Sequence, residues 1–81
     1  MDTRLSVISI IIEDRSSVGQ VNALLTEYGD YIIGRLGVPY REKGVSVISV
    51  VIDAPQDATS ALSGKLGMLS GVSSKTVTAK K

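Results

Sequence analysis

Hydrophobic and polar positions alternate along two stretches of this 81-residue chain, and the two stretches are nearly identical. Ser6 to Asp14 reads SVISIIIED, and forty residues later Ser46 to Asp53 reads SVISVVID. Val and Ile dominate both stretches and favour strands, because their branched side chains pack well on a pleated surface. We therefore expect two similar strands, Arg4 to Ile12 and Val45 to Ile52, from two repeated halves.

The segment after the first strand has the spacing of an amphipathic helix. Ser16 or Ser17 is expected to cap its first turn, and Gly29 is expected to end it in a left-handed conformation. The buried side of this helix would carry Val18, Val21, Leu24, Leu25 and Tyr28. A second strand, Tyr31 to Val38, then leads through a polar turn, Pro39 to Gly44, into the third strand.

A second and weaker helix is expected to begin near Pro55, a residue favoured in a first helical turn. Its buried side would carry Ala58, Ala61, Leu62, Leu66 and Leu69. Gly64 and Gly67 lower its helix propensity by about 1 kcal/mol each relative to Ala. After Gly71, the stretch VSSKTVTA predicts a short fourth strand, and residues 80–81 form a tail.

The resulting order of elements predicts an α+β, ferredoxin-like βαββαβ sandwich. We expect residues 1–81 to form a single domain, with a four-stranded antiparallel sheet and two helices on one face. The first and third strands are expected to lie in the middle of the sheet, parallel to each other. The second and fourth strands would form the edges, with residues that resist further pairing: Gly34, Arg35, Gly37, Ser73, Ser74 and Lys75.

Both faces of the two inner strands are apolar. The side chains of the first strand alternate between two sets: Leu5, Val7 and Ile11 on one face, and Ile8, Ile10 and Ile12 on the other. Two helices cover only one face, so the other would expose aliphatic surface at about 25 cal/mol per Å². We expect a homo-oligomer, a dimer or a tetramer, whose sheets stack or join. The alternative is a monomer in which serines soften the open face.

Composition removes several classes of function. The chain has no cysteine and no histidine, which excludes thiol and histidine catalysis and soft-metal sites. Its net charge of +1 favours neither nucleic acid nor anionic membranes. Its longest apolar run is far below the ~20 residues that cross a bilayer, and its N-terminus lacks the features of an export signal. We expect a cytoplasmic protein with no cofactor or metal and no direct contact with nucleic acid or membrane.

Carboxylates are the remaining candidates for catalysis. Glu13 and Asp14 form one pair, and Asp53 and Asp57 occupy the matching place in the second half. Acidic residues between a strand and a helix more often cap the helix and interact with its dipole. We therefore expect no enzymatic activity and assign no catalytic residue.

The loop after the first strand is a candidate ligand site. N–H groups at the start of a helix can hold an anion or a ligand carboxylate, and Arg15 would supply the counter-charge. The site would comprise Asp14, Arg15, Ser16, Ser17 and Gly19. The simpler interpretation is an ordinary helix cap with a solvated arginine.

The stretch IIIEDRSSVGQVNALLTEYGDYI resembles the start of ACT-type regulatory domains, in which a strand, an acidic and arginine-containing turn, and a Val/Leu helix ending in glycine follow one another. More closely, the stretch from RLSVISIII to VVIDAP is similar to the small stand-alone proteins named as regulators of iron-only hydrogenase systems. Their fold is ACT-like and related to the C-terminal domain of the nickel-responsive regulator NikR. The resemblance implies a regulatory module that binds a small effector or a hydrogenase-related protein at an oligomer interface. The alternative is a purely structural oligomerisation or adaptor subunit without a ligand.

Three departures from these relatives limit what the resemblance implies. Amino-acid-binding ACT domains have Pro-Gly where this chain has Ser16-Ser17, and that glycine lets a ligand approach the backbone. The nickel regulator binds its metal with His and Cys, which this sequence lacks. Only Met1 to Thr3 precede the first strand, where the DNA-binding segment of the nickel regulator would lie. Regulation of transcription would therefore act through another protein.

Overall fold

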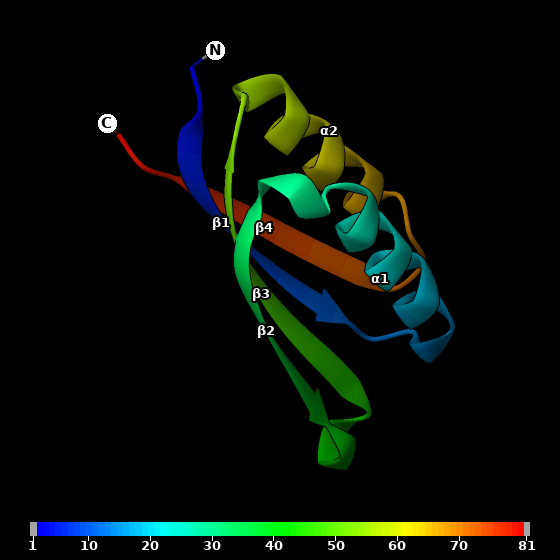
Figure 1. The fold of residues 1–81 in the computed structure, drawn as a ribbon. Coiled ribbons are helices and arrows are strands. Elements are labelled where there is room, and N and C mark those ends of the chain that lie inside the picture. The colour runs from blue at the N-terminus through cyan, green and yellow to red at the C-terminus, as the bar shows by residue number, and fades with distance from the viewer. Residues whose placement is uncertain (1, 81) are drawn as a thin grey trace.

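The computed structural model describes residues 2–80 and contains four strands and two helices in the predicted order. Their bounds are β1 (Arg4–Ile12), α1 (Val18–Glu27), β2 (Ile32–Tyr40), β3 (Val45–Ala54), α2 (Gln56–Gly67) and β4 (Val72–Thr78). Short 3-10 turns lie at Arg15–Ser17, Gly29–Tyr31 and Arg41–Lys43. The strand order is β2-β3-β1-β4, and both helices lie on one face of the sheet (Figure 1). Of the predicted lysine tail, Lys81 lies outside the described residues.

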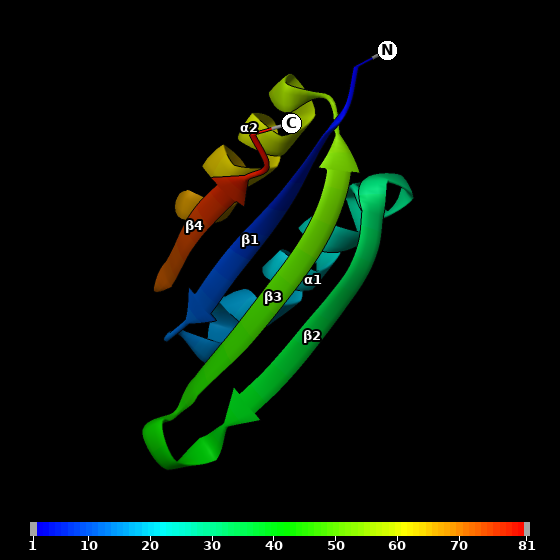
Figure 2. The same cartoon turned by 90° about the vertical axis from the view of Figure 1, so that its left-hand side faces the viewer.

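All neighbouring strands of the sheet are antiparallel, including the inner pair (Figure 2). The prediction that the first and third strands are parallel was wrong. Each β-α-β unit makes its own two strands parallel, and the β2–β3 hairpin then reverses the direction of the chain. Ser9 lies directly opposite Ser49 in the β1–β3 pair. Because these serines are forty residues apart, like the two halves of the repeat, a local two-fold axis passes between them, normal to the sheet.

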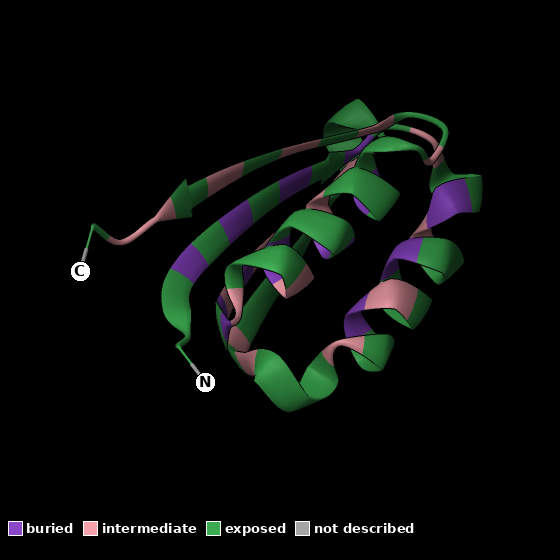
Figure 3. Cartoon of the chain, turned by 90° about the horizontal axis from the view of Figure 1, so that it is seen from above, coloured by how far each residue is buried: buried purple, intermediate pink, exposed green. Residues whose placement is uncertain are grey.

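The hydrophobic core lies between the two helices and the face of the sheet that they cover, which we call the helix face. Buried and exposed residues alternate along β1, as Figure 3 shows. The core residues are Ile8, Ile10, Ile12, Val21, Leu25, Ile48, Val50, Ile52, Ala54, Leu62 and Leu66. The predicted buried positions of both helices pack in or against this core, with the exception of Ala61, which is exposed.

The predicted ends of the first helix differ from the structure. Ser17 is the N-cap residue of α1, but its side chain does not cap the helix. Asp14 instead caps the preceding 3-10 turn, with its carboxylate accepting the Ser16 N–H. Gly29 continues into a further 3-10 turn and is not left-handed. Within residues 2–80, the backbone has a positive φ only at Gly44 and Gly71.

The sheet extends beyond the helices at one end. The β2–β3 hairpin projects past the start of α1 (Figures 1 and 2), and the longest dimension of the chain is 41 Å. The projecting end places the hairpin tip opposite the loop between β1 and α1. No helix within residues 2–80 is long and apolar enough to cross a membrane.

Candidate functional site

The β1–α1 loop, where the sequence predicts a ligand site, is closed by hydrogen bonds within the chain. Oδ1 of Asp14 accepts the Ser16 N–H at 3.0 Å and the Ser16 hydroxyl at 2.7 Å. The Ser17 hydroxyl is buried and donates to the carbonyl of Ser70 at 2.6 Å. Three of the five predicted site residues therefore stabilise the loop itself.

Electrostatics at this loop follow from the same contacts. The side-chain and backbone hydrogen bonds from Ser16 lower the pKa of Asp14 below its usual value, because they favour the charged form. Gly19 lies within α1, and a Cβ atom there would meet nothing within 4 Å. No contact within the chain requires a glycine at that position.

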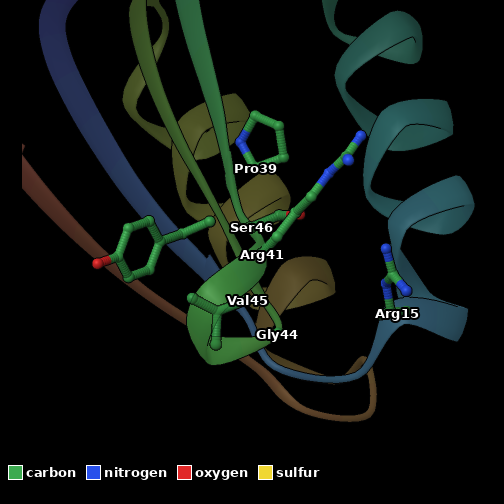
Figure 4. A pocket seen from close by; sticks show the side chains of 7 residues that line it. Arg15, Pro39, Arg41, Gly44, Val45 and Ser46 are labelled. Atoms are coloured by element: carbon green, nitrogen blue, oxygen red, sulfur yellow. The ribbon is translucent and has the colours of Figure 1, made fainter.

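Arg15 is the predicted site residue that faces open space. It lines an open cavity of about 360 Å³ between the β1–α1 loop and the projecting hairpin. The other lining residues belong to the hairpin: Pro39, Tyr40, Arg41, Gly44, Val45 and Ser46. Figure 4 shows that the guanidinium groups of Arg15 and Arg41 both reach into the space between the hairpin and the start of α1. Two positive charges and a serine hydroxyl there favour an anion.

The sequence predicts the hairpin tip only as a polar turn, and its part in this cavity was not predicted. Arg41 and Arg15 are far apart in the chain, and the projection of the hairpin beyond the helices brings them together. The only signal in the sequence was the excess of polar residues in a turn between two strongly apolar strands. That signal does not specify which loop lies opposite.

The carboxylate pairs do not form a common site. Asp14 follows the end of β1 that pairs with the start of β3, whereas Asp53 lies opposite Leu5 at the other end of the sheet. Among the described residues, no group of three or more His, Cys, Asp or Glu side chains is placed to hold a metal ion. Asp14 and Asp53 therefore do not share a cavity in which they could act as acid and base.

The sheet face opposite the helices, which we call the open face, is a second functional candidate. Side chains directly opposite one another on paired strands lie on the same face, so the strand register assigns residues to it. Its apolar residues are Leu5, Val7, Ile11, Leu36, Val38, Tyr40, Val45, Val47, Val51 and Val77. Leu36 and Val77, on the two outer strands, are 64% and 70% exposed. All four strands contribute apolar side chains to this face, which also carries Ser9, Ser49 and Lys75, and an exposed apolar surface of this kind is typical of an interface.

A four-stranded antiparallel sheet with two helices on one face, in the order βαββαβ, defines this chain as an ACT-like, ferredoxin-like α+β protein. The ACT domain of a GTP pyrophosphokinase from Chlorobium tepidum has the same fold, with a TM-score of 0.79 and 19% identity over 93% of this chain and 99% of that one. A formyltetrahydrofolate deformylase from Pseudomonas putida KT2440 shares the fold over 28% of its own length and 90% of this chain, with a TM-score of 0.66 and 15% identity.

Residues 4–76 match the TM1266-like family, described as "Iron-only hydrogenase system regulator, putative". The chain belongs to this family. The solved structure of TM1266 from Thermotoga maritima, an uncharacterised protein, is similar with a TM-score of 0.93 and 38% identity, covering 98% of this chain and 100% of that one. The family resemblance expected from the sequence is thus confirmed. The comparison with curated proteins finds no match.

Proposed function

We propose that this chain is a non-enzymatic, cytoplasmic regulatory module of an iron-only hydrogenase system. It acts by binding a small anionic ligand, or a protein partner, beside the interface of a homo-oligomer. Family membership supports the link to the hydrogenase system. The cavity between Arg15 and Arg41 supports the binding of a ligand.

One observation joins the ligand to the oligomer. Tyr40 and Val45 line the cavity and also belong to the open face, because they lie opposite each other at the end of the β2–β3 pair. A second copy that covers the open face therefore borders the cavity. A ligand held by Arg15 and Arg41 would contact both the loop and the interface, and its binding would be coupled to association.

The homo-oligomer follows from the cost of exposed apolar surface. Burying the open face against a second copy removes apolar area from water, at about 25 cal/mol per Å². Small domains without disulfides or metals commonly gain stability by association. We propose a dimer that stacks two open faces, with a tetramer as the next level of assembly.

Binding of an anion is tested by titrating the chain with inorganic phosphate and with small mono- and dicarboxylates, using calorimetry and thermal shift. A ligand at 100 times its dissociation constant adds about 2.7 kcal/mol to stability. Arg15→Gln and Arg41→Gln should each weaken binding about tenfold. Arg35→Gln is the matched control, because Arg35 donates to Asn22 at 2.8 Å and does not line the cavity. Equal losses of affinity in all three variants would contradict an anion site at Arg15 and Arg41.

A purely structural oligomerisation subunit is the second candidate function. The internal hydrogen bonds of Asp14, Ser16 and Ser17 favour it, since they leave the loop few free donors. This candidate predicts that the chain associates while no anion in the panel moves its melting point. Affinity purification from the native organism then asks whether a hydrogenase maturation factor or a transcription factor accompanies the chain.

A further inference from the structure

Helix α2 and the outer edge of β4 enclose a polar groove of about 460 Å³, on the other side of the molecule from the ligand cavity. One wall is a single face of α2 over two turns: Gln56, Thr59, Ser60, Ser63 and Gly64. The other wall is formed by Thr76 and Thr78 of β4. The side chains of both walls are small or uncharged, so the groove favours a neutral occupant that forms hydrogen bonds.

Two hydroxyl groups in this groove have no partner within the chain. Thr59 is 2% exposed, and its Oγ1 has no hydrogen-bond partner. The buried Oγ1 of Thr76 also has no hydrogen-bond partner. Within residues 2–80, these two oxygens are the only buried side-chain polar atoms without a partner. Buried hydroxyls in folded proteins are nearly always hydrogen-bonded. Because both residues line the groove, an occupant whose polar groups reach the two oxygens would satisfy them.

The main chain of β4 offers further hydrogen-bonding groups along the same edge. The Ala79 N–H donates to the Leu5 carbonyl at 2.8 Å. By the alternation of an antiparallel pair, residues 73, 75 and 77 also bond to β1, whereas Ser74, Thr76 and Thr78 direct their N–H and C=O groups outward.

The other edge of the sheet is less suited to pairing. Strand β2 has a register irregularity between Ile32 and Gly34 and contains Pro39, which has no N–H to donate. Strand β4 pairs with β1 in a continuous register from Val72 to Thr78 and contains no proline. The regular edge is therefore the one that borders the groove.

We propose that an extended segment of a partner protein binds along β4 as a fifth strand, under the cover of α2. Its main chain pairs with Ser74, Thr76 and Thr78, and its small, uncharged side chains enter the groove and hydrogen-bond with Thr59. This is recognition by strand addition. The face of α2 from Gln56 to Gly64 is about 12 Å long at 1.5 Å per residue, which matches about four residues of a strand at 3.3 Å each.

A second copy of this chain fits the edge poorly. Helix α2 packs on β4 more than on any other strand, and Figure 2 shows it behind and beyond the outer edge of β4. Pairing two β4 strands about 4.8 Å apart would bring two α2 helices to a similar spacing, although packed helices need about 8–10 Å. An extended segment has no helix of its own at this position and avoids the clash.

The proposal is tested by panning random heptapeptides displayed on phage against the full chain, with the Gly64→Arg variant used to deplete unspecific binders. A Cβ atom at Gly64 would meet nothing within 4 Å, so an arginine there starts without a clash and can occupy the groove that Gly64 lines. Gly67→Arg is the matched control, because Gly67 lies on the same helix, has equal room and does not line the groove. Selected peptides should bind Gly64→Arg at least about tenfold more weakly and Gly67→Arg as well as the unmodified chain.

Amide spectra of the chain with a selected peptide locate the binding. Slower hydrogen exchange is expected at Ser74, Thr76 and Thr78, and Thr59→Val should weaken the peptide severalfold while leaving the chain folded. The absence of enriched peptides, or peptides that are indifferent to Gly64→Arg, would overturn the proposal. A Thr76→Cys variant that forms a disulfide-linked dimer would also overturn it, in favour of pairing between two copies.

Discussion

Gly71 and Asp14 lie so close together that a Cβ atom at Gly71 would be 2.6 Å from Cβ of Asp14. The adjacent Glu13 N–H donates to the Gly71 carbonyl at 2.7 Å. Together with the bond from Ser17 to Ser70, this contact fixes the β1–α1 loop against the turn after α2. The position of Arg15 at the ligand cavity therefore depends on Gly71, which is far from it along the chain.

Gly71→Ala should lower the free energy of unfolding by about 2 kcal/mol or more, because backbone strain and a clash with Asp14 act together. Gly71 has a φ of 67°, where residues with a Cβ are strained. Gly44→Ala is the control: its φ is 66°, but an added Cβ meets nothing within 4 Å, so only the strain of about 1 kcal/mol remains. Urea denaturation measures both. Equal losses in the two variants would show that the contact with Asp14 has no energetic weight.

The charge of Asp14 should make stability depend on acid pH. Its folded pKa is lowered, so its contribution is present above the unfolded pKa near 3.9 and is lost as pH falls through the folded value. Asp14→Asn keeps a capping oxygen but has no charge. The stability advantage of the unmodified chain over this variant should shrink between about pH 5 and about pH 2. An advantage that stays constant over that range would rule out a role for the charge.

A charge placed on the open face should prevent association without unfolding the chain. Val47 lies on β3 between Ile11 and Val38 on this face and is 38% exposed. Val47→Lys should shift the sedimentation coefficient at micromolar concentration to that of one subunit, while the circular dichroism stays unchanged. Met68→Lys, at an exposed position just after α2, is the control and should leave association unaltered. If the unmodified chain already sediments as one subunit, the proposed dimer is wrong.

Removing the unpartnered hydroxyl of Thr59 should stabilise the isolated chain. Thr59→Val keeps the shape of the side chain and removes a buried oxygen that has no hydrogen bond, so the free energy of unfolding should rise by about 1 kcal/mol. Ser6→Ala is the opposite case, because the Ser6 hydroxyl bonds with Thr78 at 2.9 Å. That variant should be destabilised by about 1 kcal/mol. Thermal unfolding of the two variants checks the opposite signs.

The strands were predictable from the sequence because alternation of Val, Ile and Ser reports directly which face of a sheet each residue takes. Helix positions followed equally well from the spacing of Val21, Leu25, Leu62 and Leu66, all of which are buried. The sequence offered Asp14, Ser16 and Ser17 as capping residues, and residue type alone does not choose among them. The choice depends on the 3-10 turn before α1, which has no clear sequence signature.

The ligand cavity and the groove were beyond prediction for a different reason. Both are formed by residues distant in sequence, such as Arg15 with Arg41 and Thr59 with Thr76. Their proximity depends on how far the hairpin projects and on where α2 lies over the sheet edge, and neither quantity is encoded in a local pattern. The unpartnered hydroxyls are visible only when every neighbour of each oxygen is known.

The axis between Ser9 and Ser49 has a consequence for recognition. A half-turn about it exchanges β1 with β3 and β4 with β2, so the two inner strands present nearly the same residues to the open face in two orientations. A partner that stacks on the inner strands meets two related ways of docking, head-to-head and head-to-tail. The choice between them rests on the features that break the internal symmetry, above all the projecting hairpin with Tyr40.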